Sequence, residues 1–442
     1  MTNPTTMREA AFGAVNVLTA NGHSAFVAGG AVRDLILGRE PHDFDVTTSA
    51  TPAEVAALFP ENYDFVGAHF GVSLLKFGTF TVEVATFRTD GSYANNRRPD
   101  SVTLVKDVQL DVARRDFTVG ALLMDANGDV FDYVGGMKDL ENRVLRCVGN
   151  PFDRFEEDAL RMLRAVRFCA QLGFTMHPET FAAVCANASR VQSVSAERVA
   201  SELGKMLTSG HADVAFYLLQ SIGLAQYVMP ELVPMVGCEH DNPVHHPEGD
   251  VASHTGLLLA GLPKDCSLTL ALGALLHDVG KPVCRTVTAD GHVVFRGHAE
   301  VGAKMAEEIL RRLKFSNEVV ATVVSHVANH MRFFQVSKMK RSTLVRFART
   351  PNFTELVEVA RLDASASSGN MSDVEFVEKF LEEHEEELHC ARLVTGNDLV
   401  AMGLTPGPAF KTLLDAVETE QLEGRVTTRE AALDFVRCMV EV

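Results

Sequence analysis

The sequence predicts an α+β protein in which an N-terminal region of mixed α/β structure is followed by a chain that is helical to its end. Residues 1–150 alternate short apolar, strand-like runs with turns. From Phe155 onward, apolar residues recur at helical spacing instead. Stretches at residues 240–247 and 365–372 interrupt that pattern. We therefore expect four domains, at residues 1–150, 151–240, 241–370 and 371–442.

Several segments of the N-terminal region carry the strand pattern. The clearest are residues 25–28, 72–77, 81–87, 121–124 and 130–133. The last two flank an Ala-Asn-Gly-Asp turn, which predicts a hairpin. A further strand is expected where Phe44 and Val46 alternate with two acids.

Length, composition and cysteine pattern restrict the classes of protein to which this chain can belong. With 442 residues, 46% of them apolar, the chain predicts a globular protein of several domains. No apolar run approaches the ~20 residues of a membrane helix, and the first residues lack the pattern of a secretory signal. The eight cysteines are scattered without a Cys-x-x-Cys motif, which predicts reduced thiols in a cytoplasmic protein with no membrane partner.

The net charge of −17 disfavours a nucleic-acid partner, because phosphate contacts require local positive charge. Local basic patches can outweigh the total, although each by itself is typical of a solvated surface. The candidates are residues 97–98, Arg143 with Arg146, residues 161–167, residues 311–314 and residues 338–349. The sequence therefore permits RNA binding without requiring it.

The most informative motif joins a glycine loop to two acids. Gly29 and Gly30 follow a strand-like run and lead into Arg33, and Asp43 and Asp45 come shortly afterwards. Paired glycines allow a backbone to approach a phosphate, with amides exposed at the start of the next helix. Residues i and i+2 of a strand share one face, so the two acids can share divalent metals. For the acids alone an acidic turn would be the better explanation, but the combination predicts metal-dependent nucleotidyl transfer.

A second motif, Arg114-Arg115-Asp116, places two guanidinium groups beside a carboxylate. Arginine suits bidentate phosphate contacts, and a helix cap with a surface ion pair would explain Asp116 but not both arginines. Glu83 stands between two valines in a strand-like run and could be a third carboxylate at the metal site. Two alternatives stay open: Glu83 could face solvent, or Asp116 could be the third carboxylate.

Residues 155–168 predict one continuous helix. Its apolar residues gather on one arc, and Asp158, Arg161, Arg164 and Arg167 fall on the opposite side. A solvated face with one ion pair between residues i and i+3 is the simplest explanation. Three arginines with a single matched acid nevertheless leave positive charge for an anion, which a triphosphate would supply.

Asp158 and Arg161 could also select a base. A carboxylate accepts from an exocyclic amine, and an arginine donates to the adjacent ring acceptor. Cytosine and adenine present an amine at that place, whereas uracil and guanine present a carbonyl. The pair would therefore select C and A without a nucleic-acid template.

These motifs resemble those of the bacterial class II tRNA nucleotidyltransferases, the CCA-adding enzymes, and their relatives the bacterial poly(A) polymerases. The resemblance covers essentially the whole chain. It rests on the glycine loop with Asp43 and Asp45, Arg-Arg-Asp-Phe-Thr at 114–118, the turn from Asp132 to Gly136, and Glu-Asp-Ala-Leu-Arg at 157–161. It implies a nucleotidyltransferase head, a helical neck carrying the base-recognition helix, a body and a tail, with tRNA along the helical part.

The resemblance also implies roles for individual residues, a cofactor and partners. The implied metal-binding catalytic residues are Asp43 and Asp45, with Mg²⁺ as the ion, and Glu83 is added as a catalytic candidate on its strand pattern alone. The implied nucleotide-binding residues are Gly29, Gly30, Arg33, Arg115, Asp158, Arg161, Arg164 and Arg167. The implied partners are CTP, ATP and tRNA.

Three positions depart from the family pattern. Gly120 replaces a usual Asn, so a side-chain hydrogen bond beside the nucleotide is lost. Leu110 replaces a usual acid, although Asp111 matches. Residues 93–99 read Tyr-Ala-Asn-Asn-Arg-Arg-Pro where the family usually has Tyr-x-Asp-x-Arg-Arg-Pro. That loop is tied in the family to the switch from C to A addition, and its presence favours addition of all three nucleotides.

The helical part carries a second set of residues: His254, the vicinal pair His277 and Asp278, and Asp363. Imidazoles with carboxylates suit divalent transition metals, although a lone buried histidine is ordinarily structural. This ordered set is the pattern of HD-type phosphohydrolases, which His298, His326 and His330 could join. The body is similar to the subgroup of CCA-adding enzymes that carries such a domain, with phosphatase and phosphodiesterase activity.

The sequence therefore predicts a CCA tRNA nucleotidyltransferase that uses CTP and ATP, with an additional HD phosphohydrolase or 2′,3′-cyclic phosphodiesterase activity. Rival predictions within the enzyme class are a poly(A) polymerase and a partial CC- or A-adding enzyme. From other classes, the rivals are a protein that is chiefly an HD phosphohydrolase and a tRNA-binding protein whose head is inactive. Both a monomer and a homodimer are compatible with the sequence.

Overall fold

The computed structural model describes residues 4–64, 71–91, 101–240 and 249–440. It divides into two compact units, residues 1–233 and 234–442. A β-sheet precedes a run of helices in the first unit, and helices dominate the second. The α+β class expected from the sequence is confirmed, whereas the division into four domains stays a prediction.

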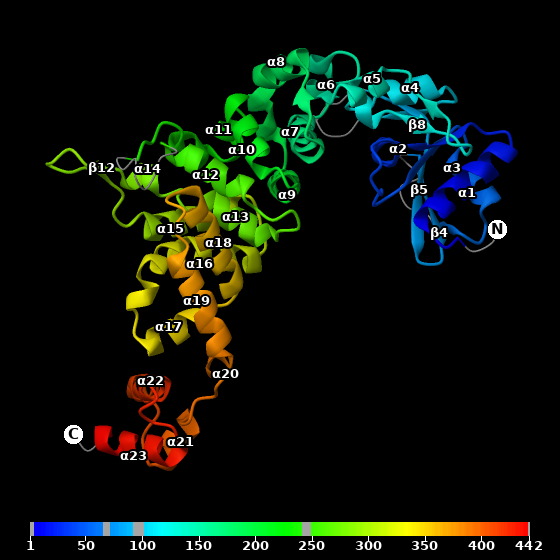
Figure 1. Ribbon diagram of the computed structural model, residues 1–442. Helices are drawn as coiled ribbons and strands as arrows, with labels where there is room; N and C mark the ends of the chain where they lie inside the picture. The colour runs from blue at the N-terminus through cyan, green and yellow to red at the C-terminus, as the bar shows by residue number, and fades with distance from the viewer. Residues whose placement is uncertain (1–3, 65–70, 92–100, 241–248, 441–442) are drawn as a thin grey trace. The chain divides into compact units, whose positions relative to one another are not determined.

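A seven-stranded sheet is the framework of the first unit (Figure 1). In chain order its strands are β1 (Ala25–Ala28), β2 (Asp45–Thr48), β3 (Tyr63–Asp64), β4 (Val72–Phe77), β5 (Phe80–Thr86), β8 (Leu123–Met124) and β9 (Val130–Phe131). Their spatial order is β3-β4-β5-β2-β1-β8-β9. The strands expected at residues 25–28 and 72–77 are β1 and β4, and the expected hairpin is the antiparallel pair β8–β9.

The register of β2 determines where the acids lie. β2 pairs antiparallel with β1, placing Ala28 opposite Asp45, and parallel with β5, placing Asp45 opposite Glu83. Neighbouring strands lie about 4.8 Å apart and paired residues point to the same face. Along β5, Val82 and Val84 are buried while Glu83 between them is exposed. Asp45 and Glu83 therefore emerge side by side.

Helix α1 (Met7–Ala20) packs against β1, β2 and β5, the strands at the centre of the sheet. Thr6 caps it by accepting the Glu9 amide at 3.1 Å, and Ala10, Ala14 and Leu18, each four residues apart, are buried. The remaining short elements of this region are α2 (Gly30–Ile36), α3 (Pro52–Leu58), β6 (Arg88–Asp90), β7 (Val102–Leu104), α4 (Val108–Ala113), η2 (Thr118–Gly120), α5 (Gly136–Glu141) and β10 (Val144–Leu145).

The chain enters its helical part through two helices, α6 (Pro151–Glu157) and α7 (Leu160–Leu172). The prediction of one helix over residues 155–168 is wrong, because Asp158 between them has an extended backbone (φ −143°, ψ 107°). Its side chain accepts the Leu160 amide at 3.0 Å and so begins a new helix. The first unit continues with β11 (Thr175–Met176), α8 (Pro178–Asn187), η3 (Ala188–Ser193), α9 (Ala196–Leu207), α10 (Ala212–Ser221) and α11 (Ala225–Val228), and the division between the units falls within η4 (Pro230–Met235).

The second unit is built from packed helices (Figure 1). Four of them pack on one another: α13 (Leu268–Leu276), α15 (His298–Arg312), α16 (Asn317–Asn329) and α18 (Phe353–Ala366). The others are α12 (Val251–Ala260), α14 (Lys281–Cys284), η5 (His330–Lys338), α17 (Arg341–Ala348), α19 (Ser372–Glu383), α20 (Glu385–Leu388), α21 (Gly396–Ala401), α22 (Pro408–Leu422) and α23 (Arg429–Val440), with a small hairpin of β12 (Thr286–Val287) and β13 (Val293–Val294).

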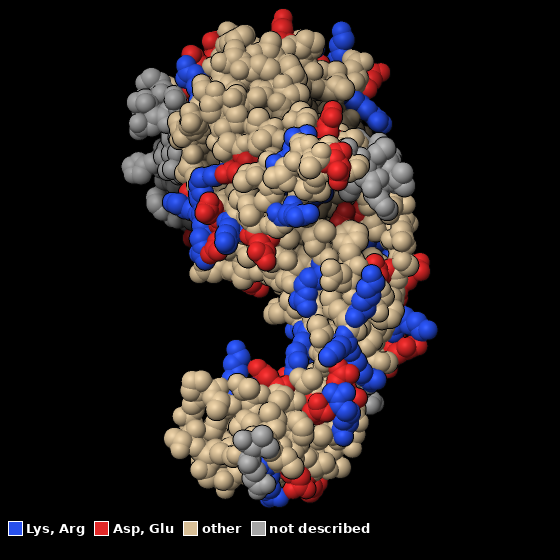
Figure 2. Space-filling view, turned by 90° about the vertical axis from the view of Figure 1, so that its left-hand side faces the viewer, with Lys and Arg blue, Asp and Glu red and all other residues tan. Residues whose placement is uncertain are grey.

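Part of the basic stretch at residues 338–349 serves packing. Arg346 and Arg349 both pair with the buried Glu418 of α22, at 3.2 Å and 3.1 Å. Lys and Arg side chains on the face seen in Figure 2 are interspersed with Asp and Glu. Residues 97–98 and the interruption expected at 241–247 lie outside the described residues. Among the helices that the structure describes, none has the length and apolarity needed to cross a membrane.

Candidate active sites

A cleft of about 620 Å³ in the first unit brings together the motifs of the N-terminal region and helix α7. Its charged lining consists of five carboxylates and seven arginines: Asp43, Asp45, Glu83, Asp116, Asp158, Arg33, Arg114, Arg115, Arg161, Arg164, Arg167 and Arg198. Gly29, Gly30, Gly120 and Phe168 also line it. Every nucleotide-site residue expected from the sequence therefore borders one space.

The glycine loop needs its glycine at position 29. Gly29 has a φ of +74°, a conformation that side chains other than glycine rarely adopt. It forms the N-cap of α2, so the first amides of that helix are not used by its own hydrogen bonds. Arg33 of α2 is held in place by Asp34, which accepts from Nε at 2.8 Å and Nη2 at 2.9 Å.

Three cleft carboxylates, Asp43, Asp45 and Glu83, make no ion pair with Arg or Lys within the described part of the chain. Asp45 is exposed to the cleft, but partial desolvation by the cleft wall raises its pKa to about 6, helped by the negative charges of Glu83 and Asp43. Asp116, the rival third carboxylate, is instead bound by Arg164, with Nε–Oδ2 and Nη2–Oδ2 distances of 2.7 Å and 2.6 Å. The register and the pairing therefore group Glu83, rather than Asp116, with Asp43 and Asp45.

Each of the seven cleft arginines has a carboxylate partner. The pairs are Arg33–Asp34, Arg114–Asp111, Arg115–Asp111, Arg161–Glu157, Arg164–Asp116, Arg167–Glu202 and Arg198–Asp158. The sequence-based expectation of unmatched positive charge on α7 is therefore wrong. The acids missing from the pattern come from other elements or from the turn before α7. A guanidinium still has more N–H donors than one carboxylate accepts, so the pairs orient these arginines without exhausting them.

Asp111 anchors the second motif. It is fully buried, accepts from Arg114 at 2.6 Å and pairs with Arg115 at 3.3 Å. Arg115 Nη1 also donates to the Gly120 carbonyl at 3.4 Å. A Cβ at Gly120 would meet only Asp116 Oδ1, at 3.8 Å, so this position has room for a larger side chain. The loop at residues 93–99, where Asn95 departs from the family pattern, lies outside the described residues.

Asp158 and Arg161 both line the cleft but are not paired with each other. Arg198 of α9 donates from Nη2 to Asp158 Oδ2 at 2.8 Å. Arg161 pairs with Glu157, and its guanidinium also donates to the Arg114 carbonyl at 3.3 Å. Both side chains are therefore fixed by neighbours while they face the cleft.

The other two α7 arginines surround an aromatic ring. Burial alone would raise the pKa of Asp116, but Arg164 holds it below its usual range. Arg167 is 8% exposed and donates from Nε to Glu202 at 2.5 Å. Arg164 and Arg167 lie 5.4 Å and 4.0 Å from the centroid of the Phe168 ring, positions that suit cation–π attraction.

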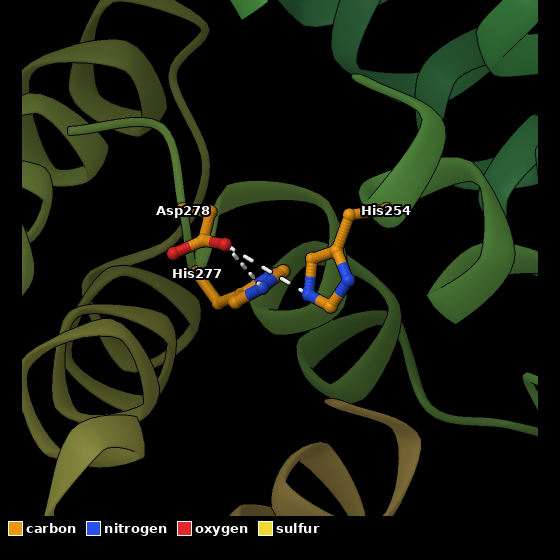
Figure 3. A group of neighbouring side chains, drawn as sticks. All are labelled: His254, His277 and Asp278. Atoms are coloured by element: carbon orange, nitrogen blue, oxygen red, sulfur yellow. Dashed lines mark ion pairs between the residues drawn. The ribbon is translucent and has the colours of Figure 1, made fainter. Parts of the chain in front are cut away.

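A second cluster lies inside the second unit. His254 of α12, His277 at the end of α13, and Asp278 converge there (Figure 3). His277 Nε2 lies 3.1 Å from Asp278 Oδ2, and His254 Nε2 lies 3.8 Å from the same oxygen. His254 Nε2 also lies 3.1 Å from Oδ1 of Asp363 on α18. The four residues expected as an HD set are therefore adjacent in space.

Further histidines lie close to these four residues. His298 and His330 approach Asp278 Oδ1 to 3.4 Å and 3.8 Å, whereas His326 lies beside Glu355, 3.8 Å away. Burial lowers the pKa of His330 to about 4, so its imidazole is neutral at pH 7. Burial alone would raise the pKa of Asp278, but His277 and Lys281 hold it well below its usual range.

A pocket of about 600 Å³ opens onto this cluster. Asp278, His298, His330 and Asp363 contribute to its wall, together with Lys281 and with apolar side chains that include Val293, Phe295, Met331 and Phe334. Lys281 Nζ lies 2.6 Å from Asp278 Oδ2. The pocket is thus lined by carboxylates and imidazoles that could bind a metal, by a lysine cation and by apolar side chains.

Sequence reasoning missed Arg198 and Phe168 in the cleft and Glu202 as the partner of Arg167, and it did not assign Lys281. Arg198 and Glu202 lie on α9, well beyond α7 in the chain. They come close to α7 only because α9 packs against it. No local spacing links them to Asp158 or Arg167. Lys281 carried a usable signal, because it lies three residues after Asp278 in a turn that brings the two together.

Three family models match parts of the chain. Poly A polymerase head domain matches residues 25–146, which carry the glycine loop and the acids. "Probable RNA and SrmB- binding site of polymerase A" matches residues 173–235. A model for tRNA nucleotidyltransferase domain 2 matches residues 292–436.

Similar curated proteins include two CCA-adding enzymes. That of Geobacillus thermodenitrificans is 46% identical over 218 residues, which are 49% of this chain and 54% of that protein. That of Levilactobacillus brevis is 46% identical over 206 residues, 47% of this chain and 52% of that protein. The chain thus spans about half the length of the curated relatives that it matches.

Similar solved structures extend over nearly the whole chain. The Bacillus stearothermophilus CCA-adding enzyme in complex with CTP gives a TM-score of 0.73 at 27% identity, covering 99% of both chains. The Thermotoga maritima CCA-adding enzyme complexed with tRNA gives 0.63 at 17% identity, covering 99% of this chain and 96% of that one. The second comparison shows likeness of fold alone.

Proposed function

This chain belongs to the family of tRNA nucleotidyltransferases and poly(A) polymerases, and from that premise we propose that it is a CCA-adding enzyme. It adds C, C and A from CTP and ATP to the tRNA 3′ end and releases pyrophosphate. One observation carries the proposal: three carboxylates without a cationic partner share a cleft with seven arginines. The carboxylates require bound cations to balance their negative charge, and the arginines offer N–H donors to a triphosphate.

Asp43, Asp45 and Glu83 fit a divalent ion such as Mg²⁺. Carboxylate oxygens are its preferred ligands, and the pKa of Asp45 is raised by desolvation first and then by the negative charges of Glu83 and Asp43, which the nearby Arg115 does not offset. When bound, the ion supplies charge stabilisation at the phosphates and favours ionisation of the attacking hydroxyl. The chain's own residues hold the reactants around it.

In the proposed reaction the tRNA 3′-oxygen bonds to the α-phosphorus as the bond from that phosphorus to the β-phosphate oxygen breaks. The hydroxyl proton passes to one of the three carboxylates, and pyrophosphate carries away the electron pair of the broken bond. The amides that follow Gly29, together with Arg33 and Arg115, hold the triphosphate. Arg164 and Arg167 add donors from α7.

Asp158 and Arg161 select the base. Asp158 accepts the exocyclic amine of cytosine or adenine, and Arg161 donates to the ring nitrogen beside it. Because Arg198 and Glu157 orient these two side chains, the groups that recognise the base are in position before the nucleotide binds. Uracil and guanine place a carbonyl against Asp158 and are disfavoured.

A gel-resolved extension assay tests the proposal on tRNA that ends at the discriminator base. We expect two added nucleotides with CTP alone, three with CTP and ATP together, and no defined product with ATP alone. A long A tail without CTP would instead identify a poly(A) polymerase, and a product that stops early would identify a partial enzyme. Normal tRNA binding with no extension would identify an inactive head.

The cluster in the second unit favours a second function, metal-dependent hydrolysis of phosphate esters. Its ligand types suit a divalent transition metal, and its pocket supplies Lys281 for a phosphate and an apolar wall for the rest of a substrate. The substrate class we propose includes 2′,3′-cyclic nucleotides. Turnover that survives Asp43→Ala but not His277→Ala would support this activity, and turnover that survives both would contradict it.

The protein is proposed to act in the cytoplasm. All eight cysteines are free, and burial raises the thiol pKa of Cys147 and Cys169 to about 12. Thiols so buried and so weakly acidic behave as small apolar side chains. This arrangement suits a reducing compartment.

A further inference from the structure

We propose that Phe168 is a positioning residue of the cleft in the first unit, whose aromatic ring fixes three arginines where they can bind the triphosphate of the incoming nucleotide. The three are Arg33, Arg164 and Arg167, which line the same cleft. Phe168 lies on α7, is partly exposed and also lines the cleft. This inference rests on the proposed nucleotidyl transfer and deepens it, because it states what keeps the phosphate-binding arginines in place.

Three guanidinium groups surround the ring of Phe168. Their central carbons lie 4.0 Å (Arg167), 5.4 Å (Arg164) and 5.5 Å (Arg33) from the ring centroid. Cation–π attraction acts at such distances, and the negative face of the ring offsets part of the repulsion between the three like charges. Among the described residues, every other ring with a contact of this kind has a single cation. The ring of Phe168 is therefore a shared support for several cations.

The three arginines come from two distant parts of the chain. Arg164 and Arg167 lie on α7 with Phe168, and the spacing of residues 164 and 168 makes their side chains neighbours on the helix surface. Arg33 lies on α2, which begins at the glycine loop. A Cβ built on Gly30 would lie 3.7 Å from Nη2 of Arg33, so this guanidinium is beside the loop. The ring of Phe168 thus joins the α7 arginines to the arginine at the glycine loop.

A second aromatic ring supports Phe168. Phe117, from the Arg-Arg-Asp-Phe-Thr motif, is 1% exposed, and the two rings form a T-shaped pair with centroids 5.7 Å apart and planes at 79°. This is a favoured geometry for aromatic pairs. The Phe117 amide donates to Asp116 Oδ1 at 2.9 Å, and Asp116 also binds Arg164. The ring of Phe168 is therefore anchored by a buried neighbour and can orient the long arginine side chains around it.

Carboxylates hold two of these guanidinium groups by one edge and leave donors for a phosphate. Asp34 accepts from Nε and Nη2 of Arg33. Asp116 is bound in the same way by Nε and Nη2 of Arg164. Neither carboxylate engages Nη1, whose N–H groups can therefore donate to a phosphate. Because the ring and the carboxylate together fix each guanidinium, less side-chain entropy is lost when a triphosphate binds.

Fluorinated phenylalanines in place of Phe168, in the full-length chain, test the proposal. Fluorine withdraws electron density from the ring face, so mono-, di- and trifluorinated rings weaken cation–π attraction stepwise with little change in shape. We expect the KM for CTP to rise progressively, by about tenfold in total, and the calorimetric Kd for inorganic tripolyphosphate to rise in parallel. The kcat should change by less than about twofold, since binding lost equally before and during the reaction raises KM alone. The CTP-to-UTP ratio of kcat/KM should stay constant, because Asp158 and Arg161 are held by other partners.

The same series at Phe347 is the matched control. Arg332 lies 4.0 Å from the centroid of that ring, but the pair belongs to the second unit and does not line the cleft. Fluorination there should leave the KM for CTP and the Kd for tripolyphosphate unchanged. A flat series at Phe168, or an equal rise in both series, would overturn the proposal. A chain that adds no nucleotide, but whose tripolyphosphate binding weakens stepwise with fluorination at Phe168, would support the proposal and overturn only the proposed nucleotidyl transfer.

Discussion

The cleft of the first unit and the cluster of the second unit both gather carboxylates, yet in opposite surroundings. Asp43, Asp45 and Glu83 are exposed to an open cleft and offer only oxygen ligands. His277 and Asp278 are 0% and 1% exposed and combine nitrogen with oxygen. An exposed oxygen site suits a hydrated ion that arrives with its substrate, whereas a buried mixed site suits a transition ion that stays. The contrast predicts two independent chemistries in one chain.

The largest expected effect comes from a substitution that inactivates the cluster of the second unit and leaves the cleft of the first unit unchanged. His277→Ala should lower hydrolysis of a 2′,3′-cyclic nucleotide by at least about 10³-fold, because it removes a metal ligand. Incorporation of CTP into tRNA should stay within about twofold, since the two sites share no residue. Initial rates of both reactions on one preparation provide the measurement.

His326→Ala is the control for that experiment, because it removes a buried imidazole outside the ligand set. It should leave both rates within about twofold of the parent. A parallel fall of both activities in His277→Ala would show that the two sites are not independent.

A smaller effect sharpens the description of the cleft. Arg198→Ala removes the guanidinium that holds Asp158 Oδ2 at 2.8 Å. We expect the preference for CTP over UTP to fall by about tenfold to a hundredfold, because a mobile carboxylate discriminates an amine from a carbonyl less well. The ratio of kcat/KM values for the two nucleotides measures this preference.

Arg190→Ala is the matched control, since Arg190 pairs with the exposed Glu156 and does not line the cleft. It should leave the CTP-to-UTP ratio unchanged. If Arg198→Ala slowed both nucleotides equally, Arg198 would support the fold and not selectivity.

The smallest expected effect is a change in thermal stability, and its sign differs between Asp45→Asn in the cleft and Asp278→Asn in the cluster. The pKa of Asp45 rises from 3.8 to about 6 in the fold, so between these values the folded state holds a proton that the unfolded state has lost. Ionised Asp45 therefore destabilises the metal-free fold above pH 6. Because this side chain faces solvent, Asp45→Asn should stabilise by only about 1 kcal/mol at pH 7.5, raising Tm by roughly 1–3 °C.

Thermal unfolding in EDTA at pH 7.5 and pH 4 measures this change, and the gain should vanish at the lower pH. Asp278→Asn should act in the opposite direction at pH 7.5, since the pKa of Asp278 lies well below its usual range and its ionised form stabilises the fold. A lower Tm for Asp45→Asn at pH 7.5 would contradict the account of the cleft.

The local parts of this molecule were predictable from sequence, and the distant pairings were not. Period-two and helical patterns located β1, β4 and the apolar side of α7, because those patterns depend only on neighbours in the chain. The break at Asp158 escaped detection, since an acid in a helical pattern gives no sign that its side chain caps a new helix.

The charge balance of the cleft was misjudged for the same reason. Arg164 finds Asp116 and Arg167 finds Glu202, partners separated by tens of residues that only tertiary packing brings near. By contrast, the grouping of Glu83 with Asp45 depends on one strand register, which a parallel β2–β5 pairing sets. The wider histidine cluster was partly foreseen, because His298 and His330 could be named but not separated from His326.

Single-turnover incorporation of labelled CTP into tRNA that lacks its CCA end tests most directly whether the paired carboxylates hold a catalytic ion. We expect Asp43→Ala with Asp45→Ala to lower this rate by at least about 10³-fold while CTP binding and helical content persist. A rate close to that of the parent would contradict this expectation, because the paired carboxylates would then hold no ion that the reaction needs.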